Sequence, residues 1–259
     1  MNNMSISMGK RQLVDSIWKS AGIEGLGTTF PNTEKILSNI PVQTKRDEVL
    51  FVVNMKRAWY FLFDNIDYPN NLSFLRELNK ICMSELSYDA GHIRRAPVTI
   101  GGTSWVPEYP HEGIIADKLS EIENMGDKLE AALEAFCFIV RAQMFLDGNK
   151  RVAQLMCNKI MMENDIGIFS VPYDDIDCFK ELLIKFYETN NSSKIKAFFK
   201  EKCLLLNPEY VHKSQLEQAD MARTLKRNNT QDNAMDGGNA EFSDEDFSGL
   251  EKECVNKSL

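Results

Sequence analysis

Apolar residues recur at helical spacing over most of the chain, so the pattern predicts a mostly helical protein. Leu13, Val14, Ile17 and Trp18, for example, share one face of a helix near the N-terminus. We predict nine helices in this way, at residues 8–19, 33–39, 47–65, 72–86, 114–124, 129–145, 151–164, 175–190 and 193–202.

Residues 96–110 follow a different pattern. Val98 and Ile100 occupy alternate positions, and the pair Gly101-Gly102 follows before a second short apolar run. Two extended runs about a Gly-Gly turn are typical of a β-hairpin. The predicted fold class is therefore all-α with one small β-hairpin.

The composition is ordinary for a globular protein, with 43% hydrophobic and 26% charged residues. No apolar run approaches the ~20 residues of a membrane-spanning helix, and the N-terminus lacks the apolar core of a secretory signal. The six cysteines are scattered without a CxxC pair, which argues against a zinc site and a disulfide framework. We therefore expect a cytoplasmic protein without a membrane partner.

The distribution of charge predicts how the 259 residues are organised. Between residues 228 and 259, eight acidic residues stand against two lysines, so this stretch holds six of the eight net negative charges. We expect a flexible N-terminus at 1–7, one domain at 8–205 and an acidic, disordered tail at 206–259. An acidic tail on a body that is not basic argues against a nucleic-acid partner.

The most informative stretch joins two strongly apolar helices. Asp147, Gly148, Asn149, Lys150 and Arg151 follow one another there, and polar groups between buried helices are costly unless they are used or solvated. The start of the second helix offers free N–H groups and partial positive charge, which suit a phosphate. A carboxylate could hold a divalent cation beside it. The alternative is a surface connection in which the aspartate caps the second helix.

Three motifs in this order resemble the Fic (Fido) family. The run from Gln143 to Gln154, QMFLDGNKRVAQ, resembles the family signature HxFx(D/E)GNGRxxR. The V-T-I-G-G-T run at 98–103, with Arg94-Arg95 before it, resembles the family's flap. The third motif is the N-terminal S-x-x-x-E-G at 20–25, which resembles the family's inhibitory motif.

The resemblance implies a Fic-like helical domain that transfers AMP from ATP to a hydroxyl of a target protein, with Mg²⁺ on the phosphates. It implies that the inhibitory segment is formed by Ser20, Glu24 and Gly25, and that Asp147 is the metal ligand. It assigns the phosphates to Gly148, Asn149, Lys150, Arg151 and Gln154, and the target protein to the flap residues Val98, Thr99, Ile100, Gly101, Gly102 and Thr103. The identity of the target is left open, as is self-association into a homo-oligomer.

The chain departs from the family signature at three positions. Gln143 takes the place of the motif histidine and cannot act as a general base, because an amide does not titrate. Gln154 replaces the final arginine, so Glu24 must reach Lys150 or Arg151 or hydrogen-bond the glutamine. The lysine in place of the second glycine is similar to the GNKR form of the Doc toxins.

Three functions remain open on these residues. The first is a protein adenylyltransferase that is slow and autoinhibited by its N-terminal segment, with Gln143 at the catalytic position. The second is a catalytically inactive module that binds a nucleotide or a peptide. The third is a Doc-like phosphotransferase toxin.

Overall fold

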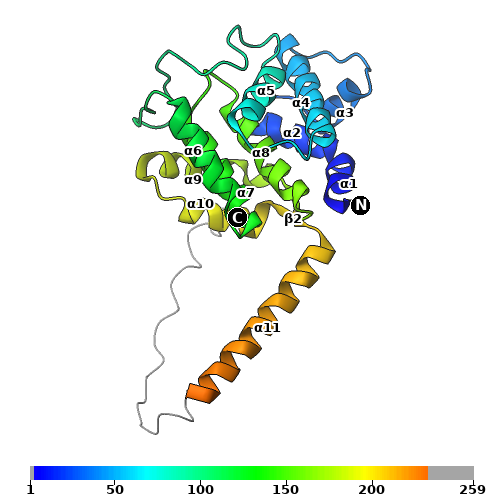
Figure 1. Ribbon diagram of the computed structural model, residues 1–259. Helices are drawn as coiled ribbons and strands as arrows, with labels where there is room; N and C mark the ends of the chain where they lie inside the picture. The colour runs from blue at the N-terminus through cyan, green and yellow to red at the C-terminus, as the bar shows by residue number, and fades with distance from the viewer. Residues whose placement is uncertain (1–2, 233–259) are drawn as a thin grey trace, which may run out of the picture. The chain divides into compact units, whose positions relative to one another are not determined.

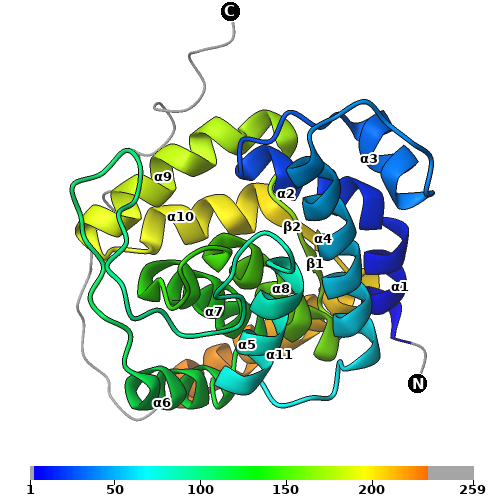
Figure 2. The same cartoon turned by 90° about the horizontal axis from the view of Figure 1, so that it is seen from above.

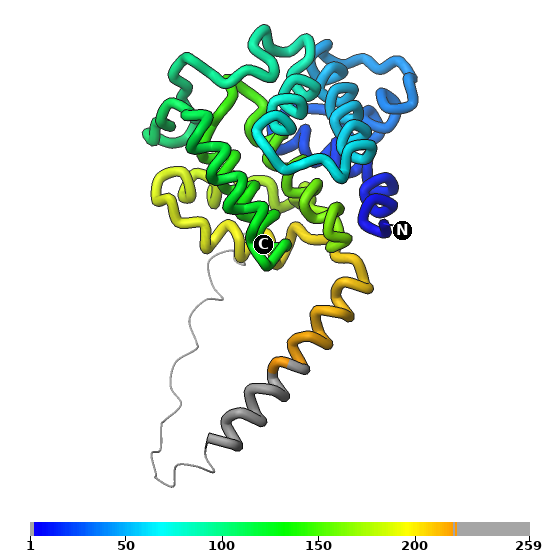
Figure 3. Tube along the Cα trace, in the orientation of Figure 1, coloured from blue at the N-terminus to red at the C-terminus, as the bar shows by residue number. Residues whose placement is uncertain are grey.

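The computed structural model describes residues 3–232. They divide into two units, and the boundary along the chain falls between Asn207 and Pro208. The course of the chain in the first unit can be followed in Figures 1 and 3. Its helices are α1 (Met4–Arg11), α2 (Leu13–Ile23), α3 (Phe30–Leu37), α4 (Arg46–Asp64), α5 (Leu72–Cys82), α6 (Glu112–Glu123), α7 (Lys128–Ala142), α8 (Asn149–Glu163), α9 (Ile176–Thr189) and α10 (Ser193–Phe198). A 3-10 turn, η1 (Tyr173–Asp175), precedes α9, and a π turn, η2 (Phe199–Cys203), follows α10.

Helices α7 and α8 form the centre of this unit, with α9 and α10 on one side and α2 and α4 on the other (Figure 2). Nearly every face of α8 is buried. A cluster of four phenylalanine rings, from α7, β1, α9 and η2, packs beside the pair at centroid distances of 4.9 to 6.1 Å, and it consists of Phe136, Phe169, Phe179 and Phe199. Burial of these large rings fixes α9 against α7.

The helical fold class is confirmed, but the N-terminal boundaries differ from the prediction. The segment at 8–19 is two helices that meet at Gln12. The prediction of a flexible stretch at 1–7 is wrong from Asn3 onward. The side chain of Asn3 caps α1, and Ser5 is buried, with its N–H donating to Asp165 at 2.8 Å.

The predicted hairpin at 96–110 is wrong, because these residues turn at Gly101-Gly102 without any strand pairing. Pro97 and Pro107 carry no N–H for a ladder. The strands that do pair within residues 3–232 are β1 (Gly167–Phe169) and β2 (Leu204–Leu206), antiparallel with Ile168 opposite Leu205. We continue to call residues 96–110 the flap.

The second unit contains helix α11 (Pro208–Asp232). The predicted disorder of the tail is therefore wrong for residues 208–232, and residues 233–259 lie outside the described part of the chain. Proline at the first position and a run of good helix formers account for this helix. Among the described helices, none combines the length and the apolar character needed to cross a membrane.

Candidate functional site

The loop between α7 and α8 is built around two residues with left-handed backbone. Gln143 ends α7 at φ 43° and ψ 53°, and Gly148 precedes α8 at φ 82°. A Cβ atom on Gly148 would lie 2.9 Å from Nδ2 of Asn79 and 3.0 Å from the side chain of Met83. Only glycine combines this positive φ with the absence of a Cβ atom, so Gly148 fixes where α8 begins.

Asn149 clamps the loop from the first turn of α8. Its Oδ1 accepts from the N–H of Phe145 at 3.0 Å, and its Nδ2 donates to the carbonyl of Phe145 at 2.8 Å. The same Nδ2 donates to Oε1 of Gln143 at 3.0 Å. The side chain of Asn149 therefore holds the loop in shape, and a contact of this residue with phosphate stays a prediction.

A cluster of charges joins α2 to the start of α8. The carboxylate of Glu24 lies 3.1 Å from Nζ of Lys150 and 3.5 Å from Nε of Arg151. Arg151 also pairs with Asp147, with Nη2 and Oδ2 3.0 Å apart. Burial alone lowers the pKa of Arg151, but the carboxylates of Glu24 and Asp147 outweigh it and hold the pKa above its ordinary value.

Ser20 joins the same arrangement one turn earlier on α2. Its hydroxyl donates to Oε1 of Gln154 at 2.7 Å, and Nε2 of Gln154 donates to the carbonyl of Lys150 at 3.2 Å. Of the partners expected for Glu24, the structure therefore selects Lys150 and Arg151, while the glutamine is taken by the serine.

The end of α2 aims Glu24 at α8. Gly25 has φ 73°, its N–H donates to the carbonyl of Gly22 at 3.0 Å, and the N–H of Leu26 donates to that of Ala21 at 2.9 Å. These two bonds are the Schellman motif that commonly ends a helix. Gly25 thus ends α2 and places Glu24 at the end of this helix, where it faces Lys150 and Arg151.

The amide of Gln143 is held on both sides. Its Nε2 donates to the carbonyl of Val140 at 2.6 Å and lies 3.5 Å from the hydroxyl of Tyr187, which belongs to α9. Burial raises the pKa of Tyr187 well above its usual value, so this phenol stays protonated. Asn149 and Tyr187 are the side chains that the structure places in hydrogen-bond contact with this amide, and neither is suited to accept a proton at neutral pH.

Arg94 ties the two ends of the flap to this loop. Its guanidinium is buried and donates to the carbonyls of Gln143 at 2.6 Å and Ala96 at 2.9 Å, and to that of Glu108. Burial lowers the pKa of Arg94. These bonds take the place of the strand ladder that the sequence predicts, and they set the flap beside Gln143.

The flap is also fastened to α9. Trp105 stacks on Tyr187 with ring centroids 5.4 Å apart, and the guanidinium of Arg141 lies 4.5 Å from the Trp105 ring. The hydroxyl of Thr103 donates to Glu188 at 3.1 Å.

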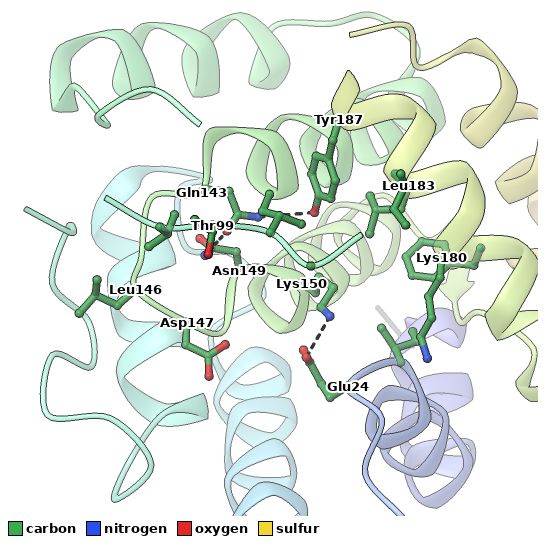
Figure 4. Close-up of a pocket in the computed structure, with 16 residues that line it drawn as sticks. Glu24, Thr99, Gln143, Leu146, Asp147, Asn149, Lys150, Lys180, Leu183 and Tyr187 are labelled. Carbon is green, nitrogen blue, oxygen red and sulfur yellow. Dashed lines mark hydrogen bonds and ion pairs between the residues drawn. The ribbon is translucent and has the colours of Figure 1, made fainter. Parts of the chain in front are cut away.

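A cavity of about 400 Å³ lies between α2, the flap, the loop and α9 (Figure 4). Nine of the predicted site residues line it, namely Glu24, Val98, Thr99, Ile100, Gly101, Gln143, Asp147, Asn149 and Lys150. Seven others surround or support it without lining it, and these are Ser20, Gly25, Gly102, Thr103, Gly148, Arg151 and Gln154.

The sequence did not predict that α9 forms one wall of the cavity. The residues of this wall are Phe179, Lys180, Leu183, Ile184 and Tyr187. Four of these residues follow the i, i+3, i+4, i+7 spacing of one helix face. That spacing marks a face but does not distinguish a pocket from a core. Ile23 and Leu146 complete the lining.

Asp147 is suited to hold a magnesium ion. Its side chain is 61% exposed at the edge of the cavity, and it offers hard carboxylate oxygens. Within the described residues, no three His, Cys, Asp or Glu side chains gather as a metal site. A single carboxylate fits Mg²⁺, which keeps several waters and is completed by the phosphates of a substrate.

The fold and the loop define a Fic-type helical domain. Residues 69–161, which include the flap and the loop, match the model of the Fic/DOC family. Residues 69–161 are therefore similar to the Fic/DOC family, whose members generally transfer nucleotide monophosphates to proteins.

Solved structures support the same fold. Fic-1 from C. elegans, residues 134–508, superposes with a TM-score of 0.58 at 21% identity, covering 71% of this chain and 58% of that one. A Fic domain containing signaling protein from Bacteroides thetaiotaomicron gives 0.60 at 16% identity, with 68% and 72% covered. A Fic family protein from Desulfovibrio desulfuricans gives 0.58 at 17% identity, with 71% and 59% covered. This chain thus spans a little under three fifths of the C. elegans structure. No curated protein sequence matches it.

Proposed function

We propose that this protein transfers AMP from ATP to a hydroxyl of a target protein, slowly, and that Glu24 holds it in an inhibited state. One observation carries the proposal. The first turn of α8, with Asp147 and Lys150 beside it, lines a cavity of about 400 Å³ that Glu24 also lines, within a Fic-type fold.

The phosphates would bind at the start of α8. Its first N–H groups have no partner within the helix and carry partial positive charge, which favours an anion. Lys150 adds a full charge at the cavity wall. Asp147 would hold Mg²⁺, which when bound neutralises phosphate charge.

Gln143 accounts for the low rate that we expect. In the reaction, the target hydroxyl oxygen bonds to the α-phosphorus and the bond to pyrophosphate breaks. The hydroxyl proton then leaves to water, because the amide of Gln143 can only orient the hydroxyl by hydrogen bonding. Loss of a general base typically costs about 10²–10⁴ in rate.

The flap is the part that would hold the target. Val98, Thr99 and Ile100 line the cavity from the flap, and they belong to no strand, so their backbone groups can pair with an extended target segment. Recognition through backbone groups places few demands on the target sequence.

Labelling with ATP that is radioactive at the α- or the γ-phosphate tests this function. The full chain and its Glu24→Gly variant are incubated with Mg²⁺ and a cell lysate, with Asp147→Ala as the inactive control. We expect label on protein from the α-phosphate, more of it with Glu24→Gly and none with Asp147→Ala. Label from the γ-phosphate alone would refute AMP transfer and favour the Doc-like phosphotransferase.

A second candidate is a module that binds a nucleotide without turnover. The hydrogen-bonded amide of Gln143 favours it, because an amide at the place of the motif histidine cannot accept a proton. In that case ATP binds in a direct titration, no label is transferred by the wild-type chain, and Gln143→His produces transfer.

A further inference from the structure

The positive charges around the cavity are mostly neutralised within the protein. Lys150 and Arg151 both pair with Glu24, and Arg151 pairs with Asp147 as well. These two cations and two anions sum to zero. An incoming polyphosphate must therefore find its counter-charge elsewhere or displace a carboxylate.

Lys180 is the exception. It lines the cavity from α9, and its ammonium has no ion pair or hydrogen bond to any residue in the part of the chain that the structure describes. Figure 4 shows it on the side of the cavity away from Asp147, with the paired Glu24 and Lys150 between them. It supplies the one lining charge that no described side chain compensates.

The place of Lys180 on its helix is informative. It shares one face of α9 with Leu183, Ile184 and Tyr187, all of which line the cavity. Lys185, on the same helix, is exposed. A lysine on an apolar inner face loses part of its hydration, which an anion in the cavity would restore.

The neutral side chain at 154 strengthens the argument. Gln154 is buried and bonded to Ser20 and to the carbonyl of Lys150, so the second turn of α8 offers no charge to a ligand. Lys150 is the cation that α8 contributes to the cavity lining, and Arg151 stands behind it. Any further cation at the cavity has to come from another element, and α9 provides it.

We propose that Lys180 binds a β- or γ-phosphate, so that the cavity selects nucleotides with two or more phosphates over nucleoside monophosphates. This assignment rests on the proposed function, because it takes the nucleotide to lie in the same cavity.

Calorimetric titration of the full chain tests the assignment. Glu24→Gln is included as a background, so that the carboxylate does not mask binding, and wild type is run in parallel. On this background Lys180→Ala is compared with Lys180→Arg, which keeps the charge, and with Lys185→Ala as the matched control. The probes are ATP, ADP, AMP, adenosine and inorganic tripolyphosphate, each with Mg²⁺.

We expect Lys180→Ala to weaken ATP and ADP by roughly 10- to 100-fold, the range for one charge-assisted hydrogen bond. AMP and adenosine should change by less than about threefold, Lys180→Arg should retain most of the ATP affinity, and Lys185→Ala should have no effect. An unchanged ATP affinity, or an equal loss for AMP, would overturn the assignment.

The probes also separate this assignment from the proposed function. If tripolyphosphate binds and depends on Lys180 while no nucleotide binds, the nucleotidyl transfer and the selection among nucleotides are both refuted, and only a contact of Lys180 with polyphosphate stands. If nucleotides bind equally well with and without Lys180, the proposed function survives and the assignment fails. Binding of none of the probes would refute both.

Discussion

Replacing Glu24 with glutamine should lower the stability of the protein and raise its affinity for ATP. The substitution keeps the shape of the side chain and removes one negative charge. Glu24 is 14% exposed and lies within 3.5 Å of two cations, so its charge matters to both quantities. The two effects have opposite signs, which makes the variant diagnostic.

The loss of stability follows from Arg151, whose side chain is 6% exposed. Removing one partner of a buried ion pair costs about 3–5 kcal/mol when it leaves a charge alone. Arg151 keeps Asp147 at 3.0 Å, so we expect a smaller cost of about 1–2 kcal/mol. For a domain of this size, that lowers the Tm by about 2–8 °C.

The gain in affinity follows from the repulsion that is removed. Two unit charges about 5 Å apart repel by about 3 kcal/mol at an effective dielectric constant near 20. Solvent at the open cavity screens part of this repulsion, leaving about 1–2 kcal/mol, or roughly 5- to 30-fold in affinity for ATP.

The assay pairs thermal unfolding with calorimetric titration of MgATP. Asp15→Asn is the matched control, because Asp15 also pairs with a lysine on α2, Lys19 at 2.6 Å, and is more exposed. We expect this control to change stability by less than about 0.5 kcal/mol and affinity by less than about twofold. A Glu24→Gln chain that loses stability without gaining affinity would refute the inhibitory role of this carboxylate.

Three further predictions follow from single residues. Gly148→Ala should lower the free energy of unfolding in urea by about 2–4 kcal/mol, from positive φ and a Cβ clash, whereas Gly101→Ala, which meets nothing within 4 Å, should be neutral. Burial raises the pKa of Cys82 to about 12 from an ordinary value of 9. Between these two pH values the thiol ionises in the unfolded chain but not in the folded one, so the free energy of unfolding falls as the pH rises above 9. This thiol contributes about 1.4 kcal/mol per pH unit, and Cys82→Ala should reduce the slope of unfolding free energy against pH by that amount. Arg94→Ala should release both ends of the flap and speed protease cleavage within 96–108, and Arg94→Lys should not restore protection, because one ammonium cannot reach all the carbonyls. Cleavage elsewhere in the chain, with 96–108 still protected, would show that Arg94 does not hold the flap.

The helices and the loop were accessible from sequence because each has a local signal. Helical periodicity placed every predicted helix of the first unit at or near an observed one. The run of polar residues from Asp147 to Arg151 identified the start of α8, since such a run interrupts two apolar helices. The pairing of Glu24 with Lys150 and Arg151 was among the expected partners because no arginine stands at 154.

The remaining features depend on contacts between distant segments. The flap has the alternation and turn of a hairpin, but Arg94 and Trp105 hold it by side chains, which no local pattern reveals. The strands β1 and β2 are only three residues long and pair across more than thirty residues. Lys180 lies on an apolar face of α9, and only the fold shows that this face borders a cavity.

The exchange of a charged for a neutral side chain at 154 determines where the inhibitory contact falls. The amide of Gln154 accepts a hydrogen bond from Ser20 and donates one to the carbonyl of Lys150, whereas a guanidinium has donors only and could not accept from the serine. An arginine there would also compete for Glu24. With glutamine at 154, the carboxylate of Glu24 pairs with Lys150 and Arg151 at the start of α8. The phosphates of a nucleotide would bind at this same helix start. Inhibition and phosphate binding then use the same cations, so that a phosphate binds by replacing Glu24 as their partner.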